Sequence, residues 1–329
     1  MVLTLLLLVT AALMALASLT LGDYPLSLSE VLATFAGAGE GFHRMIVLEW
    51  RVPVAVAAVV FGALLGIGGA IFQSLTRNPL GSPDVIGFDA GAYTAVVLTI
   101  LVMGAGGYWT VAAAALAGGL LTAFAVYVLA YRRGIQGFRL IIVGIGVSAL
   151  LGSVNAYLIT RADVEEAITV GFWGAGSITR VSWSGMVLAA VLGCLAILSA
   201  WVLAGSLRQV ELGDEVAVTQ GAAVNPARLG LVVTGVTTTA LVTAAAGPIG
   251  FIALVAPQLA RRLTGTPGVS MLSAAAMGSL LLTSAHLLSL ALAQIYRPVP
   301  VGLITVCLGG IYLIWLLIRE AHRQNGALR

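Results

Sequence analysis

Long apolar runs alternate with short polar breaks along the whole chain. Most of these runs are long enough to cross a hydrocarbon core of about 30 Å, and none alternates apolar with polar residues as membrane β-strands do. The pattern therefore predicts an all-α polytopic membrane protein with about ten transmembrane helices. The predicted spans are residues 2–21, 52–75, 84–104, 109–131, 138–159, 184–207, 228–247, 248–264, 269–291 and 301–319. The eighth is the least regular, since Pro257 interrupts it.

The composition supports this prediction and narrows the chemistry. Of 329 residues, 60% are hydrophobic and only 9% are charged, whereas soluble domains carry about 25% charged residues. All 16 basic residues are arginine. Without lysine, the chain has neither the P-loop lysine that reaches the phosphates of ATP nor an amine for Schiff-base catalysis. ATP hydrolysis by the P-loop route is therefore excluded for this chain.

No catalytic, cofactor or metal site is predicted. Cys194 and Cys307 lie far apart in apolar runs, and His43, His286 and His322 lack ligand spacing. The formal net charge of +3 is too small to indicate a nucleic-acid partner.

The arginines predict the orientation, because short cytoplasmic loops carry an excess of positive charge. With both termini inside, eleven arginines are cytoplasmic and five are external. The cytoplasmic set is Arg77, Arg132, Arg133, Arg139, Arg208, Arg228, Arg261, Arg262, Arg319, Arg323 and Arg329. The external set is Arg44, Arg51, Arg161, Arg180 and Arg297. The first run has no basic residues before it, so a retained span is favoured over a cleaved signal peptide.

Two segments of the single permease domain, 1–329, are not spans. The external segment 22–51 contains a predicted amphipathic helix at 24–39, capped by Ser27 or Ser29 and ended by Gly37. The cytoplasmic segment 208–228 contains a helix too short to span, which Asp214 and Glu215 open and Gly221 ends. Asn225 and Pro226 are predicted to cap and begin the next span.

Ionisable side chains are almost absent from the predicted spans. Ion-coupled carriers place such groups at mid-membrane, but here only Asp84, Asp89 and His286 are candidates. Asp84 is interpreted as a first-turn helix charge, and His286 as a packed, hydrogen-bonded interior side chain rather than a ligand. A secondary carrier and a membrane enzyme are both disfavoured, and an energy-coupling partner is indicated.

Four ordered motifs connect the chain to a known family. They are "GALLGIGGAIFQSLTRNPLGSPDVIGFDAGA" (62–92), "LGDEVAVTQGAAV" (212–224), "AGPIGFIALVAPQLARRLTG" (246–265) and "PVPVGLITVCLGGIYLIWLL" (298–317). Together they closely resemble the iron-siderophore and cobalamin permeases of ATP-binding-cassette (ABC) importers, the FecCD-type family. "GFWGAGSI" (171–178) and "FRLIIVGIGV" (138–147) are similar to ferric-enterobactin permease subunits that pair with a homologous subunit.

The chain departs from the family pattern in three places. Gln258 stands where relatives commonly have histidine, which argues against an essential metal or acid–base role there. Pro298 and Val299 replace residues that are often Glu or Gln, and Ser-Ala-His near residue 286 replaces an acidic residue.

The resemblance implies a type II ABC importer permease with separate partners. We expect two ATPase subunits, an external siderophore-binding protein and a homologous permease subunit, with ATP as a cofactor of the ATPase only. The cargo is expected to be an iron(III)-siderophore of catecholate, enterobactin-like chemistry that crosses the bacterial cytoplasmic membrane. A haem or cobalamin importer is the alternative within the family.

The resemblance also implies roles for particular residues. The coupling helix that docks the ATPase is expected at Leu212, Gly213, Asp214, Glu215 and Gly221. Arg77, Asn78 and Pro79 form a cytoplasmic turn, which either only breaks the helix or also packs near the coupling helix and transmits motion. Arg51, supported by Arg44 and Arg297, is expected to dock the binding protein; the alternative is that Arg51 snorkels or pairs with Glu49. Gly66, Gly68 and Gly69 are expected to allow close packing in a heterodimeric pore.

Overall fold

The computed structural model describes residues 2–84, 86–131, 137–221, 223–266 and 268–327. Within these ranges the regular elements are helices. They are α1 Val2–Ser18, α2 Leu28–Phe35, α3 Gly41–Arg44, the π-helical η1 Met45–Arg51, α4 Val52–Thr76, α5 Phe88–Leu101, α6 Tyr108–Ala130, α7 Gly137–Arg161, α8 Val164–Gly174, the 3-10 turn η2 Ile178–Arg180, α9 Trp183–Val202, α10 Ala204–Glu211, α11 Asp214–Thr219, α12 Val224–Ala246, α13 Ile252–Thr264, α14 Met271–Ile295 and α15 Val301–Ala327.

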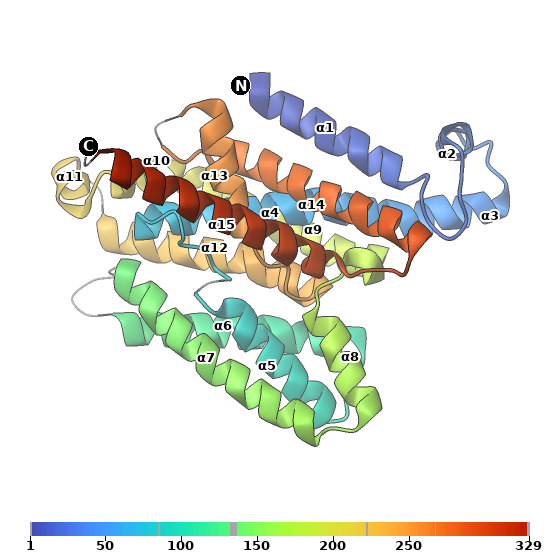
Figure 1. Cartoon of the computed structure of the whole chain (residues 1–329), viewed down its shortest axis with the longest axis horizontal. Coiled ribbons are helices and arrows are strands. Elements are labelled where there is room, and N and C mark those ends of the chain that lie inside the picture. Colours follow the sequence, from blue (N-terminus) through green and yellow to red (C-terminus); the bar gives the residue numbers. More distant parts are fainter. Residues whose placement is uncertain (1, 85, 132–136, 222, 267, 328–329) are drawn as a thin grey trace.

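The long helices run side by side along the long axis of the molecule (Figure 1). α10, α11 and the C-terminal end of α15 lie at one end, and α2 and α3 lie at the other. Helices α5 to α8 form a group beside the remaining helices, and α12 packs against both α4 and α6. The predicted cytoplasmic segment and the predicted external segment are therefore at opposite ends of the molecule, as the orientation requires.

Each predicted span contains a helix, although the helices differ in length. Six helices are long and apolar enough to cross a membrane, the longest being the continuous helix Gly41–Thr76. Val2–Ser18, Phe88–Leu101 and Val301–Leu316 are shorter apolar helices, and α13 has 13 residues. The all-α polytopic fold is confirmed, while ten full crossings stay a prediction.

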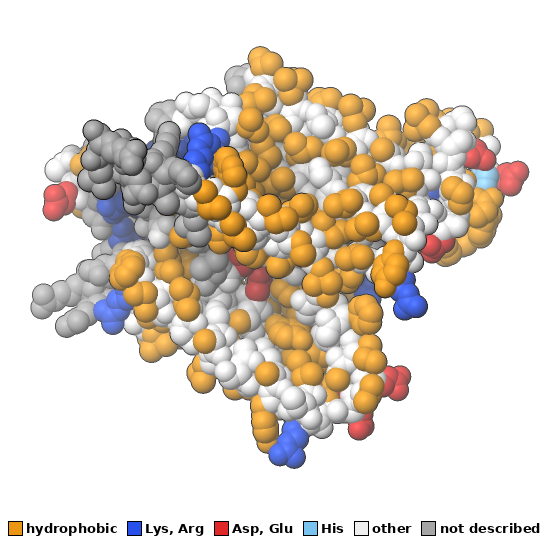
Figure 2. Space-filling view, in the orientation of Figure 1, with side chains coloured by type: hydrophobic (Ala, Val, Ile, Leu, Met, Phe, Trp, Pro, Cys, Tyr) orange, Lys and Arg blue, Asp and Glu red, His pale blue; other side chains and the backbone are white. Residues whose placement is uncertain are grey.

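On the face that Figure 2 shows, apolar side chains cover much of the surface between the two ends, whereas charged side chains lie mainly at the ends and along the lower edge. Large exposed apolar residues are frequent on α1, α7 and α9, for example Leu13, Leu150 and Leu195 at 61%, 65% and 59% exposure. This distribution suits a protein whose middle is surrounded by lipid rather than water.

Helix α4 is the centre of the packing, with 78% of its most apolar window buried. A Cβ atom at Gly62 or Gly66 would overlap backbone atoms of α14, and one at Gly69 would overlap the carbonyl of Ala253 on α13. A Cβ at Gly68 would meet Thr238 of α12. The expectation that these glycines serve a subunit interface is therefore corrected: they allow close helix approach within this chain.

Several boundaries differ from the predicted ones. α12 begins at Val224 with Ala223 as its N-cap, so Asn225 lies inside the helix instead of capping it. The sequence pattern also missed α8, a short helix with Glu165 and Glu166 in its first turn. The external helix is confirmed: Ser27 caps α2, and the side chain of Glu30 binds back to it in a capping box. These hydrogen bonds lower the pKa of Glu30 below its ordinary value.

Glycine packing around α4 predicts a specific stability difference. Replacing Gly66 with Ala places a methyl group against the Ala274 carbonyl, and we expect a loss of about 1–3 kcal/mol from overpacking. Gly152 on α7 is the control, because a Cβ there meets nothing within 4 Å. Gly152→Ala should be neutral or stabilise the helix by up to about 1 kcal/mol. Unfolding of both variants in detergent measures this; equal stabilities would contradict the packing.

Candidate functional site

The cytoplasmic turn begins where Arg77 ends α4 in a left-handed conformation, with φ 49°. Two backbone hydrogen bonds close this end: Arg77 N donates to Ser74 O at 3.2 Å, and Asn78 N donates to Gln73 O at 3.2 Å. Such a left-handed ending satisfies helix carbonyls that have no partner in the helix itself. The backbone thus reverses tightly at Arg77 instead of continuing α4.

The rest of the turn is held by side chains. The Asn78 Oδ1 atom accepts a hydrogen bond from Leu80 N at 2.9 Å, and Gln258 Nε2 donates to Pro79 O at 2.7 Å. Gln258 belongs to α13 and is 8% exposed, so it attaches the turn to a buried helix. A neutral amide side chain is suited to this role, because its NH2 group donates hydrogen bonds without carrying a charge.

Past the turn, two breaks in helical structure meet. The Asp84 Oδ2 atom accepts the backbone N–H of Phe251 at 3.0 Å, and Thr243 Oγ1 donates to Asp89 Oδ1 at 2.7 Å. Phe251, the N-cap of α13, has φ 68°, a left-handed conformation unusual for a large side chain. We call this region, residues 84 and 86–89 with 243–251, the junction. Asp84 is therefore not a first-turn charge of its own helix: α5 begins only at Phe88, and Asp84 caps α13.

A buried hydrogen bond joins α4 to the same part of α13. The Gln73 Nε2 atom donates to Leu254 O at 2.8 Å, and Gln73 is 5% exposed. Pro257 lies one turn further along and has no N–H to donate within the helix. The Gln73 amide therefore attaches α4 to α13 one residue beyond Ala253, whose carbonyl loses its helical donor at Pro257.

Three of the motifs on which the family resemblance rests meet at glycines in and beside the junction. Ser177 N donates to Ala246 O at 2.7 Å, and Gly302 N donates to Gly176 O at 2.9 Å. A Cβ atom at Gly176, Gly247 or Gly302 would overlap a backbone carbonyl of a neighbouring segment. Only glycine permits this approach, and the sequence did not reveal that the segments 171–178, 246–251 and 298–302 touch.

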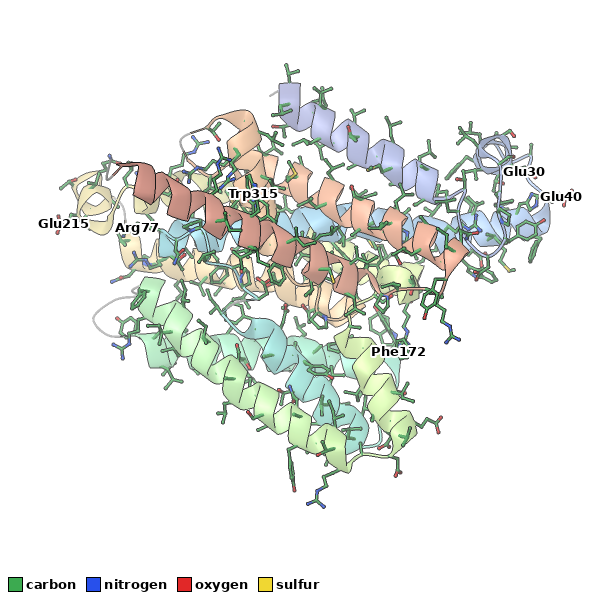
Figure 3. The ribbon with its side chains drawn as sticks, in the orientation of Figure 1. Glu30, Glu40, Arg77, Phe172, Glu215 and Trp315 are labelled. Atoms are coloured by element: carbon green, nitrogen blue, oxygen red, sulfur yellow. The ribbon has the colours of Figure 1, made fainter. Side chains whose placement is uncertain are left out.

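The cytoplasmic end carries the predicted coupling segment. Gly213 and Gly221, with φ 114° and 81°, flank α11, and Leu212 is 63% exposed. Glu215 is also exposed, whereas the side chain of Asp214 lies outside the described residues. Figure 3 shows Arg77 and Glu215 at the same end of the molecule, opposite Glu30 and Glu40. Of the predicted cytoplasmic arginines, Arg132, Arg133 and Arg329 and the side chain of Arg323 lie outside the described part.

Glu211 connects this surface to the membrane helices, and sequence reasoning missed it. Its Oε1 atom accepts from Ser74 Oγ at 3.0 Å and from Val269 N at 3.3 Å. The Nη1 atom of Arg77 is 3.8 Å from the position of a Cβ on Gly213. The turn therefore does pack beside the coupling segment. Glu211 is visible in the sequence directly before "LGDE", but its partners Ser74 and Val269 are distant in the chain.

At the outer end, Arg51 faces inward. One N–H of Arg51 donates to Leu19 O at 2.7 Å, and another donates to Tyr24 O. Arg51 therefore binds two backbone carbonyls beside and within the external segment, in place of the ion pair with Glu49 that was the alternative prediction. Arg44 and Arg297, the two supporting residues, are exposed.

Comparison with known proteins decides the family. The FecCD transport family matches residues 7–319, nearly the whole chain. The chain belongs to the FecCD transport family. FecCD proteins are permease subunits of ABC transporters; they are not enzymes, and ATP is hydrolysed on a separate subunit. This FecCD chain is accordingly a multi-pass protein of the cytoplasmic membrane, and its family works with ATPase subunits and a binding protein.

Individual relatives agree with this assignment. The ferric enterobactin transport system permease protein FepG of Escherichia coli is 43% identical over 325 residues, covering 98% of each chain. The iron(3+)-hydroxamate import system permease protein FhuG of Bacillus subtilis is 34% identical over 92% of each chain. A solved metal-chelate-type ABC transporter in an inward-facing conformation has a TM-score of 0.81 at 22% identity, covering 96% of this chain and 98% of that one. The last comparison shows the type II importer fold.

The Asp84 hydrogen bond in the junction predicts a measurable stability effect. Asp84→Ala leaves the Phe251 N–H without its acceptor, and we expect a loss of about 1 kcal/mol, as for other helix caps. Asp84→Asn keeps an oxygen acceptor and should lose less. Asp163 is a matched control, since it is the exposed N-cap of α8 but makes no capping bond. If Asp163→Ala destabilises the purified chain as much as Asp84→Ala, the capping role is contradicted.

Proposed function

We propose that this permease carries an iron(III)-siderophore of the catecholate type inward across the cytoplasmic membrane. The observation that carries the proposal is the 43% identity, over 98% of both chains, to a permease named for ferric enterobactin. The region matched, 98% of this chain, includes every helix that surrounds the junction. Catecholate complexes are anionic, and a pathway that must release them needs weak contacts instead of a basic cluster.

Uptake by reconstituted transporter tests the proposal. The permease, its partner subunits and the binding protein are placed in proteoliposomes and offered labelled ferric complexes of catecholate, hydroxamate and citrate types, with haem and cobalamin as further cargoes. The proposal expects ATP-dependent accumulation of the catecholate complex above all others. Preferential uptake of haem or cobalamin would overturn it.

The coupling segment is the proposed docking site for the ATPase. Leu212 and Glu215 are exposed at the cytoplasmic end, and the backbone of Gly213 lies against Arg77. Glu211 binds Ser74 on α4 and the loop before α14. A displacement of α11 would therefore be transmitted through direct contacts to α4, to the loop that leads into α14 and to the cytoplasmic turn. The turn would transmit it to α13 through the hydrogen bond of Gln258.

We further propose that a homologous subunit completes the pore. α7 has only 11% of its most apolar window buried, against 78% for the helix that contains α4. Gly146 and Gly152 of α7 have open space where a Cβ would be, and exposed small residues suit close contact with a helix of another subunit. A transport-competent homodimer of this chain would contradict the proposal of a heterodimer.

Substitution of Gly221 tests the coupling role. At φ 81° a β-branched side chain is strained, whereas asparagine tolerates this conformation. We expect Gly221→Val to lower transport at least about tenfold while insertion persists, because roughly 1–3 kcal/mol of local strain displaces α11 from its docked position. Gly221→Asn should keep most transport. Transport-linked ATPase activity that is normal in Gly221→Val would refute the assignment.

Docking of the external binding protein is proposed to rely on the exposed Arg44 and Arg297, with Arg51 holding the external segment in shape. Reversing a charge that contacts a partner weakens association by about 2–5 kcal/mol when the pair is desolvated. Arg44→Glu and Arg297→Glu should each weaken binding in nanodiscs, more strongly at low salt. Arg161→Glu, on an exposed external arginine of α7, is the control.

For Arg51, Arg51→Glu should also weaken association, but by releasing the carbonyls of Leu19 and Tyr24. Protease sensitivity of the external segment should therefore increase together with the loss of binding. If Arg44→Glu and Arg297→Glu both bind like the unmodified permease at two ionic strengths, docking through these arginines is refuted.

A further inference from the structure

A cavity of about 240 Å³ lies at the outer end of the helices. Its walls come from the end of α1 and the loop that follows, the π-helical η1, the start of α4, the turn η2 and the outer half of α14. The cavity lies away from the junction and the coupling segment. Of its lining residues, Arg51 has a role proposed above, in holding the external segment, and the space itself has none. Its lining combines charged, polar and apolar side chains.

His286 on the cavity wall is the most informative residue. It is 4% exposed, and its Nδ1 atom is buried without a hydrogen-bond partner among the described residues. The expectation of a packed, hydrogen-bonded histidine is therefore met only in part. A buried polar atom without a partner costs free energy, and most such atoms in folded proteins are satisfied. The cavity is the space from which a partner for His286 can come.

Charges of both signs line the same space. Arg51 donates single N–H groups to the carbonyls of Leu19 and Tyr24, and a guanidinium has five N–H donors in total. Asp23 also lines the cavity. Arginine binds phosphate through paired N–H groups, and a carboxylate attracts an ammonium group. The two charges together match a zwitterion better than a simple anion or cation.

An exposed aromatic residue marks the level of the cavity along the helices. Trp50, which lines it, is 57% exposed, and exposed aromatic residues gather at the membrane–water interface. Val54 on α4 comes three residues after Arg51, the last residue of η1, and so lies further along the helix toward the cytoplasmic end. Val54 and Leu290 give the deeper part an apolar wall.

We propose that the cavity binds one zwitterionic phospholipid of the outer leaflet, with an aminoethyl phosphate headgroup. The phosphate binds Arg51, the ammonium lies beside Asp23, the glycerol ester accepts a hydrogen bond from His286, and an acyl chain covers Val54 and Leu290. Plain hydrocarbon would leave His286 without a partner, and a soluble phosphate compound would leave the apolar wall in water. A metal ion would find only one histidine and one carboxylate here.

Native mass spectrometry of the delipidated full-length chain tests the proposal. The ligands are short-chain phosphatidylethanolamine, phosphatidylcholine, soluble glycerophosphoethanolamine and inorganic phosphate. Phosphatidylethanolamine should bind with one-to-one stoichiometry and more tightly than phosphatidylcholine, whose methylated ammonium has no N–H for Asp23. Leu290→Trp fills the cavity and should abolish this binding. Leu288→Trp is the matched control, because Leu288 is 42% exposed on the same helix and does not line the cavity.

A second variant isolates the histidine. His286→Leu should weaken phosphatidylethanolamine binding about tenfold, the size expected for one hydrogen bond, and His286→Gln should restore part of it. Equal binding by Leu290→Trp and Leu288→Trp would overturn the proposal. Equally tight binding of glycerophosphoethanolamine or phosphate would replace the lipid with a soluble ligand, and absence of any binding would also overturn the lipid site.

Discussion

Backbone polar groups within a bilayer must find hydrogen-bond partners inside the protein, since lipid supplies none. This constraint explains why the break before α5 lies beside α13 and the break that precedes it. Side chains of each region satisfy backbone groups of the other. Asp84 accepts the N–H of Phe251, while Gln258 donates to the carbonyl of Pro79. Without either segment, the other would carry unsatisfied groups that cost free energy.

The same contacts give the permease a mechanical connection between its surface and its interior. Glu211 holds the end of α10 against α4 and the loop before α14. The cytoplasmic turn lies between this surface and α13, and Phe251 packs against Gly309 of α15. Irregular backbone at this depth changes conformation more readily than a continuous helix, because its hydrogen bonds come from side chains. An importer driven by ATPase subunits needs such a connection between distant parts.

The sequence predicted most of what local chemistry determines. Apolar runs located the helices, arginines gave the orientation, and the Ser27–Glu30 pair identified the external helix. Gly221 was expected to end the short cytoplasmic helix, and it follows α11 with φ 81°, as glycine at a helix end often does. Four motifs identified the family, because they occur in the family's order along the chain. The apolar pattern of single helices would not have separated one membrane fold from another.

Long-range partners were beyond the sequence. Asp84 was interpreted as a charge of its own helix, because nothing in its neighbourhood reveals a hydrogen bond to Phe251, 167 positions away. Gly66 was assigned to a subunit interface because a small residue does not say which helix approaches it. Both errors concern what touches a residue, not which element contains it. For Arg51, the sequence did not reveal the carbonyls of Leu19 and Tyr24 as hydrogen-bond partners, and its part in docking stays a prediction.

The central claim is that the cytoplasmic turn moves together with the coupling segment when ATP is used. Hydrogen–deuterium exchange of the assembled transporter, compared between the nucleotide-free and ATP-bound states, measures this most directly. The account predicts that peptides covering residues 77–89 and residues 208–221 change exchange together, and that replacing Glu211 with Gln reduces the change in the first peptide. A change confined to residues 208–221, with residues 77–89 unaffected by ATP, would contradict the account.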